Sequence, residues 1–158
     1  MPTETPEITD LDRMMMRHAL DLAARAAALD EVPVGAVVYQ GDRILGRGHN
    51  LRESSHDPTA HAEIIALRQA AAALQSWRLE HCSLAVTLEP CPMCAGAILN
   101  ARIPRLLFGP PDPKMGCVST LYQLCSDARF NHRCQVIPNL LSDESAALLK
   151  DFFRRRRG

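Results

Sequence analysis

Two short histidine and cysteine motifs constrain the fold of this chain more than any other feature. The first is His61-Ala62-Glu63, and the second is Pro90-Cys91-Pro92-Met93-Cys94. Histidine and cysteine are side chains that Zn²⁺ prefers, and three protein ligands leave the fourth tetrahedral position open for water or substrate. Cys91 and Cys94 are three residues apart, so on a helix they lie on one face and can bind one ion. The chain must therefore bring His61 to the two cysteines, and the open position predicts a catalytic zinc site.

A structural zinc knuckle is the alternative use of a Cys-x-x-Cys pair. Such a site is closed by a fourth protein ligand. The four remaining cysteines form no second Cys-x-x-Cys pair, and free cysteine is commonly buried. We therefore favour the catalytic site and expect the following residues to be buried structural thiols: Cys82, Cys117, Cys125 and Cys134.

Hydrophobic periodicity and turn residues predict four helices and five strands. The predicted helices cover residues 10–29, 60–74, 92–100 and 143–156, with Asp10 and Ser142 as N-caps. The predicted strands cover residues 34–39, 44–49, 83–88, 105–108 and 134–138, and the first two form a hairpin. This order predicts an α/β fold whose sheet is covered by helices on both faces. His61 and Glu63 then lie in the first turn of the second helix, and Cys91 lies between the third strand and the third helix.

The composition suits a single domain over residues 1–158. With 158 residues and 47% hydrophobic content, the chain can bury one hydrophobic core. No apolar run approaches the roughly 18 residues that span a bilayer, and the polar N-terminus does not resemble a secretory signal. Six cysteines outside a secreted context predict reduced thiols. We expect a cytoplasmic protein without membrane contact, in which residues 1–9 form a loose leader.

The charge distribution points to one local basic segment. The chain has 18 basic and 18 acidic residues, so its net charge does not indicate a nucleic-acid binder. Four consecutive arginines at residues 154–157 form a basic tail. Such a tail can bind phosphates, or it can be a solvated helix end that complements the negative C-terminal dipole. Both interpretations remain open from the charge pattern alone.

Glu63 is the candidate proton-transfer group. It is two positions from His61, which directs it away from the metal and leaves its carboxylate free. Two thiolates cancel the charge of zinc, so a water on this metal needs a helper base, and Glu63 can act as general base and then as general acid. The Ala62 N–H, at the start of the same helix, is a candidate donor to the attacking oxygen.

The two motifs and their flanks resemble a known enzyme family. His-x-Glu followed by Pro-Cys-x-x-Cys, with a glutamate that is not a ligand, is typical of zinc-dependent nucleobase deaminases. The flanking segments closely resemble the bacterial tRNA-specific adenosine deaminases: residues 32–37, His49-Asn50, residues 56–64, residues 88–98 and residues 130–133. The resemblance implies conversion of adenosine to inosine at the wobble position of a tRNA anticodon stem-loop. It also implies a homodimer with one Zn²⁺ per subunit and a cytidine-deaminase-like, three-layer α/β/α fold around a mixed five-stranded sheet.

The resemblance further assigns roles to individual residues. His61, Cys91 and Cys94 become zinc ligands, Glu63 the proton shuttle and Asn50 a base-binding amide, although Asn50 alone could equally be a turn residue. The remaining candidate RNA contacts are Asp112, Lys114, Asn131, Arg133, Phe152 and Arg154.

The sequence leaves alternatives open at three of these candidate contacts, Asp112, Lys114 and Phe152. Pro111, Pro113 and Met115 depart from some relatives, so the contacts of this loop stay open while its place as a cleft wall is expected. Phe152 and Phe153 are adjacent and cannot share one helix face, so one should pack inward and the other is the candidate for stacking on a nucleotide. The residues alone favour the alternative in which both belong to the core.

Two other functions remain as rivals. A free-base or nucleotide deaminase acting on guanine, cytosine or dCMP would share the zinc motif, because one fold hosts many functions. A non-enzymatic interaction module would have no use for an unligated carboxylate beside the metal. The basic tail favours an open cleft for a polyanion, and Glu63 favours an enzyme.

Overall fold

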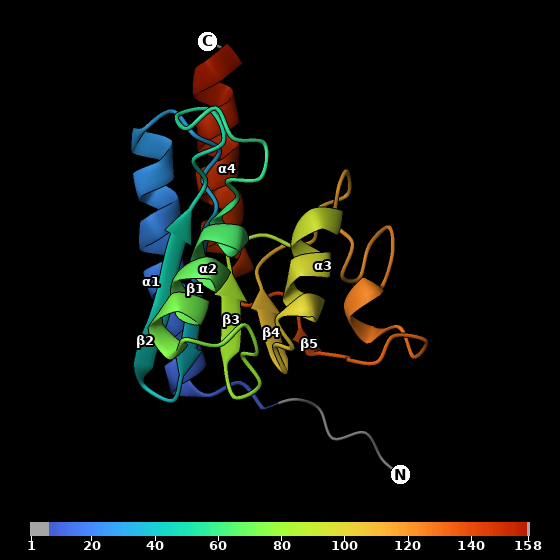
Figure 1. The fold of residues 1–158 in the computed structure, drawn as a ribbon. Coiled ribbons are helices and arrows are strands. Elements are labelled where there is room, and N and C mark those ends of the chain that lie inside the picture. The colour runs from blue at the N-terminus through green and yellow to red at the C-terminus, as the bar shows by residue number, and fades with distance from the viewer. Residues whose placement is uncertain (1–6, 158) are drawn as a thin grey trace.

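The computed structural model describes residues 7–157, and its strands form one mixed sheet (Figure 1). The strands are β1 (Gly35–Gln40), β2 (Arg43–His49), β3 (Ser83–Val86), β4 (Arg105–Phe108) and β5 (Gln135–Ile137). They lie in the order β2-β1-β3-β4-β5. Strand β1 is antiparallel to both β2 and β3, whereas β3, β4 and β5 are parallel. The prediction of a mixed five-stranded sheet is confirmed.

Helices cover both faces of this sheet. They are α1 (Asp10–Ala28), α2 (Ala62–Leu74), α3 (Pro92–Asn100) and α4 (Ser142–Arg157), with a short 3₁₀ helix η1 (Leu124–Ser126) that was not predicted. Figure 1 shows α2 and α3 on one face and α1 and α4 on the other. Residues of β1 alternate between the two layers, since Val37 packs on the α1 side and Val38 on the α2 side. The three-layer α/β/α prediction is therefore confirmed.

None of the helices within residues 7–157 has the length and hydropathy needed to cross a bilayer.

The N-terminal boundary differs from the prediction. Thr9, rather than Asp10, is the N-cap of α1, because its hydroxyl accepts a hydrogen bond from Asp12 N while the Asp12 carboxylate accepts one from Thr9 N. Ile8 packs against the core. Residues 7–9 thus belong to the fold and not to a loose leader, and residues 1–6 of that predicted leader lie outside the described residues. At the other end, Ser142 is the first residue of α4 and not a cap preceding it.

Strand β2 lets α2 lie directly on the sheet. A Cβ at Gly46 would be 2.1 Å from the Ala66 carbonyl oxygen, and a Cβ at Gly48 would be 2.2 Å from the Ala62 carbonyl oxygen. Only glycine allows such a close approach of a helix backbone to a strand. Because Ala62 directly follows His61, Gly48 sets the depth at which the first turn of α2 meets the sheet.

Candidate metal centre

Two helix N-termini bring the predicted ligands together. His61 is the N-cap of α2, Cys91 is the N-cap of α3, and Cys94 lies in the first turn of α3. The His61 Nδ1 atom is 3.6 Å from Cys91 Sγ and 3.5 Å from Cys94 Sγ. Tetrahedral zinc with bonds of about 2.3 Å to sulfur and 2.0 Å to nitrogen holds these atoms about 3.5 Å apart. The three ligand atoms lie within 4.8 Å of one another, so their chemistry and spacing fit a three-ligand zinc site.

The electrostatics of the cluster favour a thiolate at Cys91, whereas the hydrogen bond between the two cysteines and burial raise the pKa of Cys94. Neither α2 nor α3 has a side-chain cap, so the free N–H groups of both first turns are available to the cluster. A hydrogen bond from Cys94 lowers the pKa of the Cys91 thiol to about 4, assisted by one from His61 and opposed by burial. The same contact with Cys91 raises the pKa of His61. A thiolate is the form of cysteine that binds metal, so Cys91 is prepared for ligation.

Glu63 lies beside the cluster without belonging to it. It is the second residue of α2, is only 4% exposed, and lines the same cavity as His61 and Cys91. Burial raises the pKa of its carboxyl group. A carboxyl group with a raised pKa exchanges protons at neutral pH more readily than an exposed one. The position and the environment of Glu63 therefore suit proton transfer.

A cavity of about 210 Å³ opens over these groups. Its apolar walls come from Val32, Val34, Leu88 and Met115, and its polar groups from Asn50, Arg52, Glu63 and Asp112 among others. Apolar walls combined with convergent polar groups are typical of a pocket for a small ligand. Arg52 was not predicted as a lining residue, and its only sequence signal was its place in the loop that contains Asn50.

Comparisons with known proteins assign this geometry to a family. Residues 10–157 match the MafB19-like deaminase family. The tRNA-specific adenosine deaminase of Haemophilus influenzae is 49% identical over 150 residues, which cover 94% of this chain and 87% of that protein. The tRNA-specific adenosine deaminase of Bacillus subtilis is 44% identical over 146 residues, covering 92% and 91%. The chain belongs to the MafB19-like deaminase family.

Solved structures agree with this assignment. A structure from work on A-to-I editing by tRNA:A34 deaminases at the wobble position matches this deaminase with a TM-score of 0.82 and 43% identity, covering 86% of this chain and 99% of that one. Guanine deaminase from Nitrosomonas europaea matches with a TM-score of 0.79 at 24% identity, covering 94% and 88%, which shows a shared fold alone. The resemblance to tRNA-specific adenosine deaminases is confirmed, and the free-base alternative is not favoured.

Asn50 lies in the cavity wall of this deaminase, and it is also a turn residue. Its Nδ2 donates to Val32 O at 3.3 Å, and its Oδ1 accepts from Arg52 N at 3.0 Å, two residues along the chain. This second bond is the local contact typical of asparagine in turns. One amide hydrogen and one oxygen lone pair are left over for a base, so the two interpretations are compatible.

The loop after β4 contains two predicted RNA contacts, Asp112 and Lys114, and one of them lines the cavity. Asp112 lines it, as does Met115, and both follow the expectation that this loop forms a cleft wall. Lys114 is exposed and does not line the cavity.

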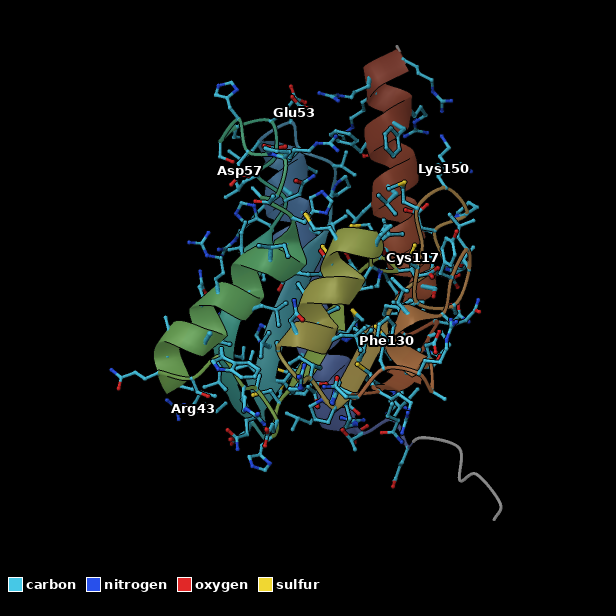
Figure 2. All side chains as sticks on the ribbon, turned by 45° about the vertical axis from the view of Figure 1, so that its right-hand side comes forward. Arg43, Glu53, Asp57, Cys117, Phe130 and Lys150 are labelled. Carbon is cyan, nitrogen blue, oxygen red and sulfur yellow. The ribbon has the colours of Figure 1, made fainter. Side chains whose placement is uncertain are left out.

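Asn131 and Arg133, two of the predicted RNA contacts, do not line the cavity of their own subunit. His132, between them, contacts Ile103 O at 2.7 Å just before β4, and β5 runs parallel to β4. The segment before β5 therefore lies at the amino edge of the parallel strands, whereas Cys91 follows the carboxyl end of β3. Figure 2 shows Phe130 in the lower part of the molecule, well below Asp57 in the loop that leads to α2.

The choice between the adjacent phenylalanines is also corrected. Phe152, the predicted RNA contact, is 6% exposed, while Phe153 is 46% exposed. Arg154 lies on the surface, where its guanidinium is 2.7 Å from the Asp151 carboxylate. The exposed aromatic side chain at the end of α4 is therefore Phe153.

Proposed function

We propose that this protein converts adenosine to inosine at the wobble position of a tRNA anticodon, with one zinc ion per subunit. The observation that carries the proposal is a buried carboxylate, Glu63, beside a His-Cys-Cys cluster whose spacing fits zinc, in a chain 49% identical to a tRNA-specific adenosine deaminase. His61, Cys91 and Cys94 would hold the metal. Bound zinc supplies a Lewis acid that makes water a nucleophile at neutral pH.

Glu63 moves the protons of the reaction. Its carboxylate accepts a proton from the water that attacks C6 of the adenine ring, and it delivers that proton to ring nitrogen N1. A second proton from the attacking water passes through the same carboxylate to the exocyclic amine, which leaves as ammonia while C6 becomes the carbonyl of inosine. Its burial and raised pKa support both directions of transfer.

The cavity walls orient the base for this attack. Val34 and Leu88 provide apolar contacts, and the remaining donor and acceptor of the Asn50 amide can bind a purine edge. The Ala62 N–H, in the first turn of α2, would donate to the attacking oxygen. An anticodon loop suits such a pocket, because a loop base is extruded at less cost than a base from a duplex.

The RNA strand would follow the rim of this cavity toward the end of α4. Arg156 in α4 donates to Asp30 O at 3.4 Å, and Val32, two residues farther on, lines the cavity. The basic tail thus lies at the cavity end of the molecule, with Phe153 exposed beside it. A loop nucleotide can stack on an exposed aromatic ring, and arginines can bind its phosphates. Asp112 would contact the strand from the opposite wall.

We further propose a single-domain subunit that forms a homodimer through α2 and α3. A hollow of about 280 Å³ between these helices is lined mainly by apolar residues, among them Ile64, Ala97 and the 58% exposed Trp77. A self-complementary apolar face is typical of twofold dimers. Sedimentation of the purified protein measures its mass in solution, and a monomer at micromolar concentration would contradict this assignment.

Because tRNA is the proposed substrate, the expected compartment is the cytoplasm.

The decisive test compares substrates directly. We expect the purified protein to release ammonia and form inosine with an anticodon stem-loop that carries adenosine at the wobble position. Guanine, cytosine and dCMP should be inert. Rapid turnover of a free base with an unchanged stem-loop would reject the proposal. Removal of metal with a chelator should abolish turnover, and added Zn²⁺ should restore it.

A further inference from the structure

The loop between β4 and η1 is wrapped around one buried carboxylate, Glu89. This side chain is only 2% exposed. Oε1 accepts from Asp112 N at 3.0 Å and from the Thr120 hydroxyl. Oε2 accepts from the backbone N–H groups of three successive residues at 3.1, 2.8 and 3.1 Å: Val118, Ser119 and Thr120. None of the ion pairs in the described part of the chain includes Glu89, so hydrogen bonds from this loop hold its charge.

The backbone around Glu89 reinforces this arrangement. Glu89 N donates to Pro110 O at 3.1 Å, and Cys117 N donates to Pro90 O at 3.0 Å. Gly116 packs directly on the carboxylate, since a Cβ there would be 2.3 Å from Glu89 Oε1. The loop is therefore fitted to this one side chain, with no space for an additional methyl group.

The same loop forms one wall of the cavity. Asp112 and Met115 line the cavity, and so does Glu89. Asp112 Oδ1 accepts from Lys114 N at 3.0 Å and from Met115 N at 3.3 Å, which fixes the turn between them. Glu89 holds the backbone of Asp112, and Asp112 in turn holds Met115.

We infer that Glu89 positions the substrate indirectly. Its carboxylate fixes the backbone of residues 110–120 so that Asp112 and Met115 contact the bound nucleotide. The inference rests on the proposed function, which assigns this wall to RNA. A carboxylate suits the task because it only accepts hydrogen bonds and offers about four lone-pair sites. An amide in its place would direct its own N–H groups at donors of the loop. Charge-assisted bonds are also stronger than neutral ones.

Glu89→Gln tests this role, with Asp12→Asn as the matched control. Asp12 is an equally buried carboxylate, 1% exposed, but it lies in α1 on the opposite face of the sheet. For Glu89→Gln we expect the KM for the stem-loop to rise about tenfold, the change that corresponds to one lost hydrogen bond to a charged acceptor. Zinc content should be retained. Amide hydrogen exchange at Asp112, Val118, Ser119 and Thr120 should accelerate.

The control and a milder variant separate positioning from stability. Asp12→Asn should lower the melting temperature and leave the KM unchanged. Thr120→Val removes only the hydroxyl contact and should raise the KM by a smaller factor, which keeps the test available if Glu89→Gln folds poorly. The inference would be overturned if Glu89→Gln and Thr120→Val both left the KM and the hydrogen exchange of the loop unchanged. It would also be overturned if Asp12→Asn raised the KM as much as Glu89→Gln. If the native protein does not convert the stem-loop, the proposed function fails, whereas hydrogen exchange still measures whether Glu89 holds the loop.

Discussion

Gly48→Ala tests how the sheet positions the metal ligands. The new methyl carbon would lie 2.2 Å from the Ala62 carbonyl oxygen and 2.9 Å from Ala66 N. Relieving such contacts requires the first turn of α2 to retreat by about 1 Å, because non-bonded heavy atoms repel each other well inside their optimal separation. His61 precedes Ala62 and Glu63 follows it, so ligand and proton shuttle move together. A displacement of about 1 Å can reduce the rate about 10²-fold, and overpacking costs about 1–3 kcal/mol of stability.

The assay is inosine formation at subsaturating stem-loop, which reports kcat/KM, together with zinc content and the melting temperature. We expect kcat/KM to fall about 10²-fold in Gly48→Ala. Gly96→Ala is the matched control, because nothing in residues 7–157 of the subunit lies within 4 Å of a Cβ at that position in α3, and Gly96 does not line the hollow of the proposed dimer face. It should stay fully active and gain up to about 1 kcal/mol from helix propensity. Gly46→Ala makes the same kind of clash one turn farther from His61, so it should lose comparable stability and less activity. Native kcat/KM and zinc content in Gly48→Ala would refute the reasoning.

Three further predictions address the chemistry, the core and the tail. Glu63→Gln should keep zinc and RNA binding and lose at least about 10²-fold in turnover, and a fully active variant would remove the proton-transfer role. Burial opposes the ionisation of Asp12, but hydrogen bonds from Arg105, Thr9 and Tyr39 outweigh it and hold the pKa of this carboxyl well below its usual range. The contribution of ionised Asp12 to the free energy of unfolding is therefore complete above pH of about 4 and is lost on further acidification. Asp12→Asn should lower the free energy of unfolding by about 3 kcal/mol at neutral pH and by less in acid, which denaturant titrations across pH would measure. Truncation after Phe153 should weaken stem-loop binding. It should also reduce the slope of log binding constant against log salt concentration, by at most about 0.7 per removed phosphate contact. Identical affinity at every salt concentration would exclude the tail from RNA binding.

The sequence predicted those parts of the fold and site that depend on local signals. The motifs predicted the cluster of His61, Cys91 and Cys94 with Glu63 beside it, and hydrophobic periodicity located every helix and strand of the described residues except η1. The role of Glu89 had no local signal, because its hydrogen-bond donors are 23 to 31 residues farther along the chain.

The burial of Phe152 and the places of Asn131 and Arg133 could not be predicted from the sequence, for a related reason. Phe152 and Phe153 follow Leu148 and Leu149 by four residues each, so both helix faces are equally apolar in sequence. Only the packing of α4 beside α1 buries Phe152. Likewise, the positions of Asn131 and Arg133 depend on the direction of β5, which the residues of that strand do not specify.

Strand direction also explains why motifs 30 residues apart meet. Strands β2 and β3 are each antiparallel to β1, so both end at the same edge of the sheet and deliver α2 and α3 there. Buried carboxylates hold the connecting loops at this edge. Glu31 accepts from Glu53 N at 3.0 Å and from the backbone and hydroxyl of Ser54, and Glu89 holds the opposite loop. Because neither carboxylate is a metal ligand, we expect both walls to persist without zinc. Chelation should therefore abolish turnover while hydrogen exchange at Ser54 and Ser119 stays slow, and rapid exchange at both amides would show instead that the metal organises the cavity.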